Sequence, residues 1–142
     1  YMTVLIDSNI LIYAINTSSP KHSEAKTFLR ELRDTPVIAH QNILEAFRIL
    51  THAKYSHPMP VGSALRSLNL LCGDSQMILP NSLTFSLLQE FSTVHKLDGN
   101  RVFDAYLAAT ALSNDVHTIA TDNVKDFAKF SGLKVTNPFA KV

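Results

Sequence analysis

Four carboxylates stand where short apolar runs of this sequence end or where helical patterns begin. Asp7 directly follows the run TVLI, and Asp122 lies two residues after the run TIA. Glu45 and Asp104 each lie about one turn into a segment with helical spacing of its apolar residues. If the fold brings these acids together, each like-charged pair at about 4 Å costs about 4 kcal/mol at an effective dielectric near 20.

A helix dipole does not compensate for that repulsion, because it stabilises an acid by only about 0.3–1 kcal/mol. The four acids must therefore raise their pKa values or hold a cation. Because no histidine or cysteine accompanies them, hard oxygen ligands favour Mg²⁺ or Mn²⁺ over zinc. Such an ion acidifies a bound water and holds a phosphate oxygen. The pattern therefore predicts metal-dependent hydrolysis of phosphodiester bonds.

Each acid taken alone has a simpler interpretation. Asp7 suits the N-cap of a helix, Asp122 suits a turn, and Asp104 suits the positive end of a helix dipole. The functional hypothesis therefore depends on whether the fold makes these residues converge.

Short apolar runs alternate with helical patterns along the whole chain. The predicted strands are 3–6, 36–39, 77–79, 118–120 and 134–136, and the predicted helices are 10–15, 22–33, 41–54, 61–72, 83–95, 101–112 and 124–130. Asn100 is the predicted N-cap of the helix over 101–112. This alternation predicts a single-domain α/β/α sandwich around a mostly parallel sheet of four to five strands. Ligands of such folds bind beyond the carboxyl ends of the strands, which is where the acids are expected.

Length and composition fit one packed domain. The chain has 142 residues, 46% of them hydrophobic, a formal net charge of +1 and one cysteine, Cys72. The single cysteine favours a reducing, cytoplasmic setting, and no apolar stretch approaches the ~20 residues of a membrane span. The expected domain covers residues 2–142, and Tyr1 ahead of Met2 is interpreted as left over from an expression vector.

Four segments resemble one known family in order and spacing. They are VLIDSNILIYA, NILEAFRIL, RVFDAYLAATA and IATDNVKDF, the last followed by GLKVTNP. The sequence resembles the PIN domain, in particular the VapC-type ribonuclease toxins of toxin–antitoxin pairs. The family's three acids match Asp7, Glu45 and Asp104, and its polar helpers match Asn9 and Thr121. Together the segments run from the first predicted strand to the last.

The resemblance implies a chemistry and a set of partners. It implies that Asp7 and Asp104 bind Mg²⁺ or Mn²⁺, that Glu45 shapes the site directly or through water, and that RNA is cleaved to leave a 5′-phosphate and a 3′-hydroxyl. It also implies a homodimer and a cognate antitoxin protein whose C-terminal segment blocks the site.

The fourth position of the family's site stays open among three side chains. Members often carry an Asp two residues after the threonine, where this chain has Asn123. Asp122 ranks first, Asn123 second, and Asp126 is interpreted as a helix-capping or salt-bridging residue.

Other side chains enter as weaker predictions. Arg101 and Lys125 each lie three residues from a proposed site acid and are the best candidates for holding RNA phosphates. Ile49, Leu65 and Leu68 are candidates for a dimer face, although core packing explains each of them as well. The histidines show no metal-binding spacing, and no glycine-rich phosphate loop is present.

Three alternatives differ in what they need from the sequence. A phosphatase with an Asp-x-Asp loop would use Asp7-Ser8-Asn9, which lacks the second Asp. A phospho-receiver domain needs an acceptor Asp after its third strand, where this chain has Pro80-Asn81-Ser82. A PIN-like scaffold that binds RNA or protein without cutting remains, and the four carboxylates argue against it.

Overall fold

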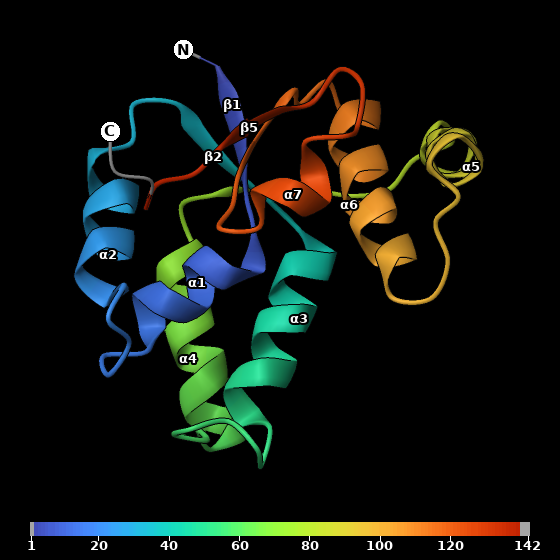
Figure 1. The fold of residues 1–142 in the computed structure, drawn as a ribbon. Coiled ribbons are helices and arrows are strands. Elements are labelled where there is room, and N and C mark those ends of the chain that lie inside the picture. Colours follow the sequence, from blue (N-terminus) through green and yellow to red (C-terminus); the bar gives the residue numbers. More distant parts are fainter. Residues whose placement is uncertain (1, 140–142) are drawn as a thin grey trace.

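The computed structural model describes residues 2–139 and contains one five-stranded sheet in which every neighbouring pair is parallel. The strand order is β3-β2-β1-β4-β5, so β1 lies at the centre (Figure 1). The strands are β1 (Thr3–Ile6), β2 (Thr35–Ala39), β3 (Gln76–Ile78), β4 (Thr118–Ala120) and β5 (Lys134–Thr136). The predicted parallel sheet is confirmed.

Seven helices in the described residues connect the strands and cover the sheet. They are α1 (Ser8–Ile15), α2 (His22–Glu31), α3 (His40–Thr51), α4 (Val61–Cys72), α5 (Thr84–His95), α6 (Arg101–Ser113) and α7 (Val124–Phe127). Helices α1 to α4 pack on one face, and α5 to α7 pack on the other. This arrangement confirms the predicted α/β/α sandwich.

Successive side chains of β1 point to opposite faces of the sheet, so this strand contributes to the hydrophobic clusters on both sides. Val4 and Ile6 belong to the hydrophobic cluster under α1 to α4, whereas Leu5 belongs to the cluster under α5 to α7. Successive strand residues point to opposite faces, so a strand covered on both faces must be apolar throughout. All three side chains are at least 97% buried. The run TVLI is therefore apolar because β1 is central.

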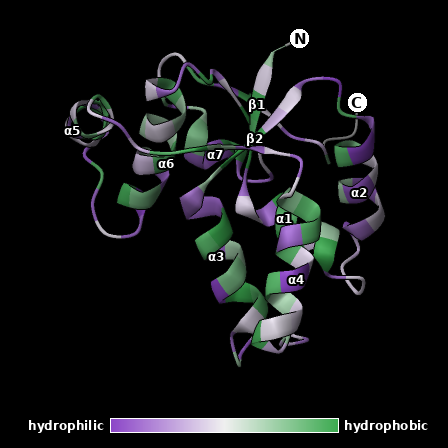
Figure 2. Ribbon diagram, turned by 180° about the vertical axis from the view of Figure 1, so that it is seen from behind, coloured by the Kyte–Doolittle hydropathy of each residue, from purple (hydrophilic) through white to green (hydrophobic). Residues whose placement is uncertain are grey.

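The distribution of apolar residues in each helix matches how much of that helix is buried. Figure 2 shows hydrophobic and hydrophilic segments alternating along α3, as expected of a helix with one buried face. In α6 the run from Ala105 to Ala111 is buried almost without a break. This helix is small-sided and uncharged after Asp104, so it approaches the sheet closely on one face and α5 on another.

Some element boundaries differ from the predictions by one to three residues, whereas β1, α4, β4 and β5 have the predicted bounds. Helix α2 ends at Glu31, α3 ends at Thr51 and α7 ends at Phe127, each earlier than predicted. Asn100 does stand at the N-cap of α6, but its side chain makes no capping hydrogen bond. Tyr1 and residues 140–142, which bear on the predicted domain limits, lie outside the described residues.

The topology places the ends of β1, β2 and β4 side by side. Asp7 follows β1, α3 begins directly after β2, and Thr121 follows β4. Asp7 donates its backbone N–H to the carbonyl of Ala120 at 3.0 Å, which joins the ends of β1 and β4. No helix among residues 2–139 is both long and apolar enough to cross a membrane.

Candidate functional site

Asp7 is the most deeply held carboxylate of the site. It is the N-cap of α1, its side chain is 4% exposed, and its Oδ1 accepts the N–H of Ser8 at 2.8 Å. The Oδ2 atom accepts the hydroxyl of Thr121 at 2.7 Å and the amide of Asn9 at 3.3 Å. The amide of Asn42 donates to Oδ1 at 3.4 Å. Donors from three parts of the chain thus fix both oxygens.

Glu45 lies on α3 and is tied to its neighbours through both oxygens. Its Oε2 accepts the hydroxyl of Ser8 at 3.1 Å, which places Glu45 beside Asp7. Its Oε1 accepts the amide Nε2 of Gln41 at 2.8 Å, one turn earlier on the same helix. The same Nε2 donates to the carbonyl oxygen of Phe103 at 2.9 Å, at the start of α6. Glu45 is therefore held between α1 and α6.

Asp104 is the exception, because its carboxylate has no hydrogen bond or ion pair within residues 2–139. Partial burial, followed by the negative charges of Asp126, Asp7 and Glu45, raises its pKa to about 6, while Lys129 acts in the opposite direction. Because this carboxylate has no partner of its own, its oxygens are free to bind a cation. Perturbed carboxylates of this kind concentrate at functional sites.

The pKa of Asp7 is also raised. Burial raises the pKa of Asp7, and the negative charge of Glu45 raises it further. The hydrogen bonds from Thr121 and Ser8 stabilise the ionised form and act against this rise. The fold therefore brings Asp7, Glu45 and Asp104 to one place at the carboxyl ends of the strands, as the sequence pattern predicts.

The structure does not bring Asp122 to the other three acids, because its side chain is bound elsewhere. Its Oδ2 accepts the ammonium of Lys21 at 2.5 Å and the hydroxyl of Tyr13 at 2.9 Å. Lys21 holds the pKa of Asp122 below its usual range, and no other acid contributes to that shift. Asp122 thus forms an ion pair on the side of the loop that faces α1 and α2, rather than completing the acidic group.

The other predicted polar residues near Asp122 differ in whether their side chains reach the acids. Thr121 is buried and binds Asp7, and Asn9 donates to Thr121 at 3.1 Å, so both predicted helpers lie in the site. Asn123 donates its backbone N–H to the hydroxyl of Thr121 at 3.0 Å, and its side chain is exposed. Asp126, interpreted from sequence as a capping or ion-pairing residue, is the acid whose charge acts most strongly on Asp104.

The two residues predicted to contact RNA phosphates differ in whether they form an ion pair. Arg101 pairs with Asp98 at 2.7 Å, on an exposed surface. Lys125 is exposed and makes no ion pair within residues 2–139. Lys129 is the base whose positive charge acts on Asp104. The base that influences Asp104 is thus neither of the two candidates that the sequence favoured.

Sequence reasoning missed three features of the site: Gln41, Ser8, and the contacts that Lys21 and Tyr13 make with Asp122. Gln41 carries a detectable signal, because it precedes Glu45 by four residues and so shares its helix face. Ser8 stands next to Asp7 but looks like any polar residue of a helix start. The contact of Lys21 with Asp122 joins residues 101 positions apart, and no local pattern announces it.

The donor set fits a magnesium-like ion. Among residues 2–139, no three His, Cys, Asp or Glu side chains are arranged to hold a metal ion by themselves. Mg²⁺ does not need such a cage, because it binds through one or two carboxylates and keeps several waters. Asp7 and the unpartnered Asp104 offer two carboxylates, and the side chains that donate to Asp7 are hydroxyl and amide groups.

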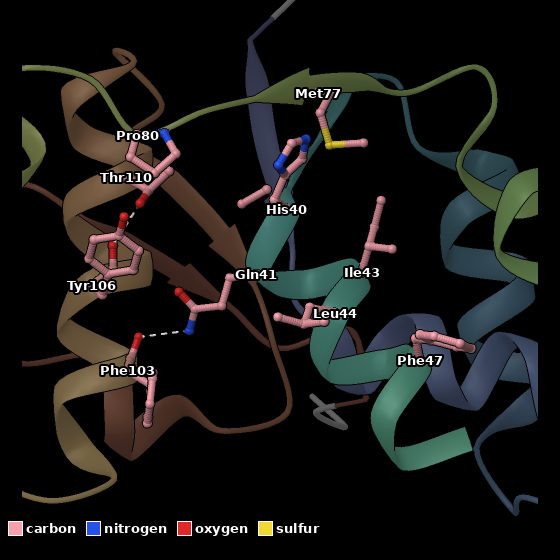
Figure 3. A pocket seen from close by; sticks show the side chains of 11 residues that line it. His40, Gln41, Ile43, Leu44, Phe47, Met77, Pro80, Phe103, Tyr106 and Thr110 are labelled. Carbon is pink, nitrogen blue, oxygen red and sulfur yellow. Dashed lines mark hydrogen bonds between the residues drawn. The ribbon is translucent and has the colours of Figure 1, made fainter. Parts of the chain in front are cut away.

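An apolar cavity opens beside the acids, between α3, α6 and the edge strand β3 (Figure 3). Its volume is about 690 Å³. Leu44, Met77 and Phe103 line it and are 68%, 41% and 59% exposed. The residues that line it are Ala39, His40, Gln41, Ile43, Leu44, Phe47, Met77, Pro80, Phe103, Tyr106 and Thr110. Of the predicted dimer-face residues, Leu68 is buried, Ile49 is partly buried and Leu65 is 42% exposed.

Comparison with known proteins gives one family and one set of relatives. The family model of the PIN domain matches residues 4–133. Ribonuclease VapC24 of Mycobacterium tuberculosis is 26% identical over 137 residues, which cover 94% of each chain. VapC ribonuclease Mb2897 of Mycobacterium bovis is 27% identical over 139 residues, which cover 94% of this chain and 93% of the relative.

Solved structures share the fold over nearly the whole chain. VapBC-1 from nontypeable Haemophilus influenzae matches with a TM-score of 0.75 and 20% identity, covering 98% of this chain and 100% of that one. VapBC2 from Rickettsia felis, solved with a DNA fragment from its promoter, matches with a TM-score of 0.73 and 19% identity, covering 96% and 98%. At these identities the likeness establishes the fold alone.

The raised pKa of Asp104 predicts how stability depends on pH. An acid with a folded pKa of about 6 and an ordinary value of 3.8 stabilises the fold at low pH and loses that contribution as pH rises through 6. In EDTA, Asp104→Asn should therefore exceed the wild type in unfolding free energy at pH 7 by about 1–2 kcal/mol, after allowance for partial exposure. Urea unfolding at pH 4, 5, 6 and 7 measures the difference, which should vanish at about pH 4.

Asp74→Asn is the matched control, because Asp74 is an exposed acid in the turn before β3. Its effect should be small and independent of pH. A destabilised Asp104→Asn protein at pH 7 would show that the carboxylates do not repel one another as the geometry requires.

The Lys21–Asp122 pair predicts a coupling energy. The two side chains are 38% and 21% exposed, so their interaction should contribute about 0.5–1 kcal/mol in a double-mutant cycle of Lys21→Met and Asp122→Asn. Because the pKa of Asp122 is lowered, the coupling should persist at neutral pH and disappear as acid protonates Asp122. Urea unfolding of the four proteins measures it, and strictly additive effects would argue against the pair.

Proposed function

Because the chain belongs to the PIN domain family, we propose that it is an endoribonuclease that hydrolyses RNA phosphodiester bonds with Mg²⁺ or Mn²⁺. We further propose that it is the toxin of a toxin–antitoxin pair and acts in the cytoplasm. The names of its relatives support this proposal, since VapC24 and Mb2897 are both called ribonucleases.

The observation that carries the proposal is the convergence of Asp7, Glu45 and Asp104. Asp104 is partly buried, faces other acids and has a pKa raised to about 6. Such repulsion has to be compensated, and a divalent cation compensates it while creating a binding point for a phosphate. A purely structural role would leave the site with unfavourable electrostatics and no benefit.

Each residue has a distinct task in the proposed reaction. Asp7, whose oxygens are fixed by Thr121 and its other donors, would hold the ion in one place. Asp104 would complete the ligand set with its unpartnered carboxylate. Glu45, held by Ser8 and Gln41, would orient the attacking water and accept its proton.

The bound cation would supply an acidified water and neutralise charge on the scissile phosphate. Lys129, whose charge already reaches Asp104, would face the same phosphate, while exposed Lys125 and Arg101 would contact the RNA backbone farther away. No covalent enzyme intermediate is needed, and the products would carry a 5′-phosphate and a 3′-hydroxyl.

The phosphatase alternative receives less support from the contacts. Asn9 occupies the position of the second aspartate, and its amide already donates to Asp7 and Thr121. An amide in that position cannot act as general acid or base. A scaffold that binds RNA without cutting would not need the acidic group at all.

Protein partners form the second part of the proposal. Several similar structures are described as VapBC or toxin–antitoxin complexes, which supports a cognate antitoxin for this chain. We assign the apolar cavity between α3 and α6 to self-association into a homodimer, because its rim exposes Leu44 and Phe103. Exposed apolar surface of this kind marks protein interfaces more often than free surface.

The proposed chemistry predicts the effect of two substitutions. Asp7→Asn and Asp104→Asn should each lower Mg²⁺-dependent RNA cleavage by about 100-fold or more, because each removes a ligand charge. A fluorogenic RNA assay with Mg²⁺, Mn²⁺ or EDTA measures the rates. Asp122→Asn is the control and should retain most of the activity, because Asp122 binds Lys21 instead of the acidic group.

Two outcomes would contradict this mechanism. If both variants cleave as fast as the wild type, the acids are not catalytic. If the wild type cuts no RNA with either metal while binding it, the scaffold alternative is favoured.

The proposed dimer predicts a second result. Leu44→Asp should shift the protein to monomer in sedimentation velocity, because it places a charge on the apolar rim of the cavity. Leu70→Asp is the matched control, since Leu70 on α4 is 87% exposed and lies away from the cavity lining. A wild-type protein that sediments as a monomer, or a Leu44→Asp protein that stays dimeric, would overturn the assignment.

A further inference from the structure

Gln41 joins the two halves of the acidic site through one amide nitrogen. Its Nε2 donates one N–H to Glu45 Oε1 at 2.8 Å and the other to the carbonyl oxygen of Phe103 at 2.9 Å. Phe103 immediately precedes Asp104 in α6. Figure 3 shows the side chain reaching from α3 toward α6 along the wall of the cavity. The residue thus contacts one acid directly and the backbone that carries another.

The orientation of this amide is determined by its neighbours. Both contacts are oxygen acceptors, so the nitrogen and not the oxygen must face them. The amide oxygen Oε1 is consequently buried and has no hydrogen-bond partner within the described residues. A buried acceptor without a donor destabilises a fold. The protein therefore keeps an amide here although a purely apolar side chain would suit the cavity wall better.

We propose that Gln41 is a positioning residue that holds Glu45 and the Asp104-bearing start of α6 in the arrangement that RNA cleavage requires. This inference rests on the proposed nuclease function and deepens it. Glu45 retains only the bond from Ser8 at 3.1 Å when the amide is removed. A glutamate side chain held at one oxygen recovers rotamer freedom, so its average geometry becomes less productive.

A positioning role and a structural role predict opposite changes in stability. Removing the amide leaves Glu45 Oε1 and the Phe103 carbonyl in partly exposed places where water replaces the lost bonds. It also removes the orphaned oxygen from an apolar wall. Leucine at position 41 should therefore preserve the fold while the catalytic arrangement loosens.

The experiment compares Gln41→Leu, Gln41→Glu and a control with the wild type. Gln41→Glu keeps the size of the side chain and replaces the donor by an acceptor. Gln89→Leu, an exposed position on α5, makes the same chemical change away from the site. Each protein is examined by urea unfolding in EDTA, by steady-state RNA cleavage with Mg²⁺, and by ¹³C NMR of glutamate carboxyl carbons.

The NMR measurement reports on Glu45 without any metal or substrate. The glutamates of the chain are Glu24, Glu31, Glu45 and Glu90, and comparison with Glu45→Gln assigns the signal of interest. In Gln41→Leu the Glu45 signal should move toward those of the exposed glutamates. It should stay in place in Gln89→Leu.

The expected result is a separation of activity from stability. In Gln41→Leu and Gln41→Glu, kcat should fall about 10–100-fold, the range seen when a residue supporting a metal ligand is removed, while KM for RNA changes less than about twofold. The urea midpoint of Gln41→Leu should equal or exceed that of the wild type.

Distinct outcomes overturn the inference and the proposed function. An unchanged kcat, an unmoved Glu45 signal, or a fall in kcat matched by a fall in the urea midpoint would each overturn the positioning role. Absence of cleavage by the wild type would overturn the nuclease proposal, and the NMR comparison would still decide whether Gln41 orients Glu45.

Discussion

The repulsion among carboxylates at the carboxyl ends of β1, β2 and β4 is the constraint around which this structure is arranged. Asp7 is almost fully buried, and its charge is tolerated because Thr121, Ser8 and two side-chain amides donate to it. Asp104 has no such donors, and its partial burial, followed by the charges of Asp126, Asp7 and Glu45, raises its pKa to about 6. The fold thus supplies hydrogen-bond donors to Asp7 and leaves the carboxylate of Asp104 free to bind a ligand.

The parallel sheet makes this concentration of charge possible. With β1 in the centre and β2 and β4 beside it, residues separated by more than a hundred positions meet at one edge. Parallel strands need crossover helices, and those helices begin at the same edge. Helices α1 and α3 start there and contribute Ser8 and Glu45, while α6 reaches it with Asp104 through the backbone contact of Gln41.

Sequence was sufficient where local pattern and topology agree. The five strands follow from apolar periodicity, and the convergence of Asp7, Glu45 and Asp104 was expected from strand ends, helix starts and the resemblance to the family. It was insufficient where a long-range contact decides between neighbours. Asp122 was ranked ahead of Asn123 and Asp126, but Lys21 and Tyr13 bind it. The partners that decide this lie on α1 and before α2, and no pattern near Asp122 indicates them.

A difference of one residue explains why Thr121 and Asp122 have opposite roles. Thr121 still pairs with β5, since it donates its backbone N–H to Thr136 at 2.9 Å, and the chain bends at the next residue, Asp122. The side chain of Thr121 contacts Asp7, whereas that of Asp122 contacts Lys21. The ion pair and the buried hydrogen bond hold the same loop from its two sides. A charge that looks catalytic in the sequence thus anchors the loop that orients the catalytic candidate Asp7.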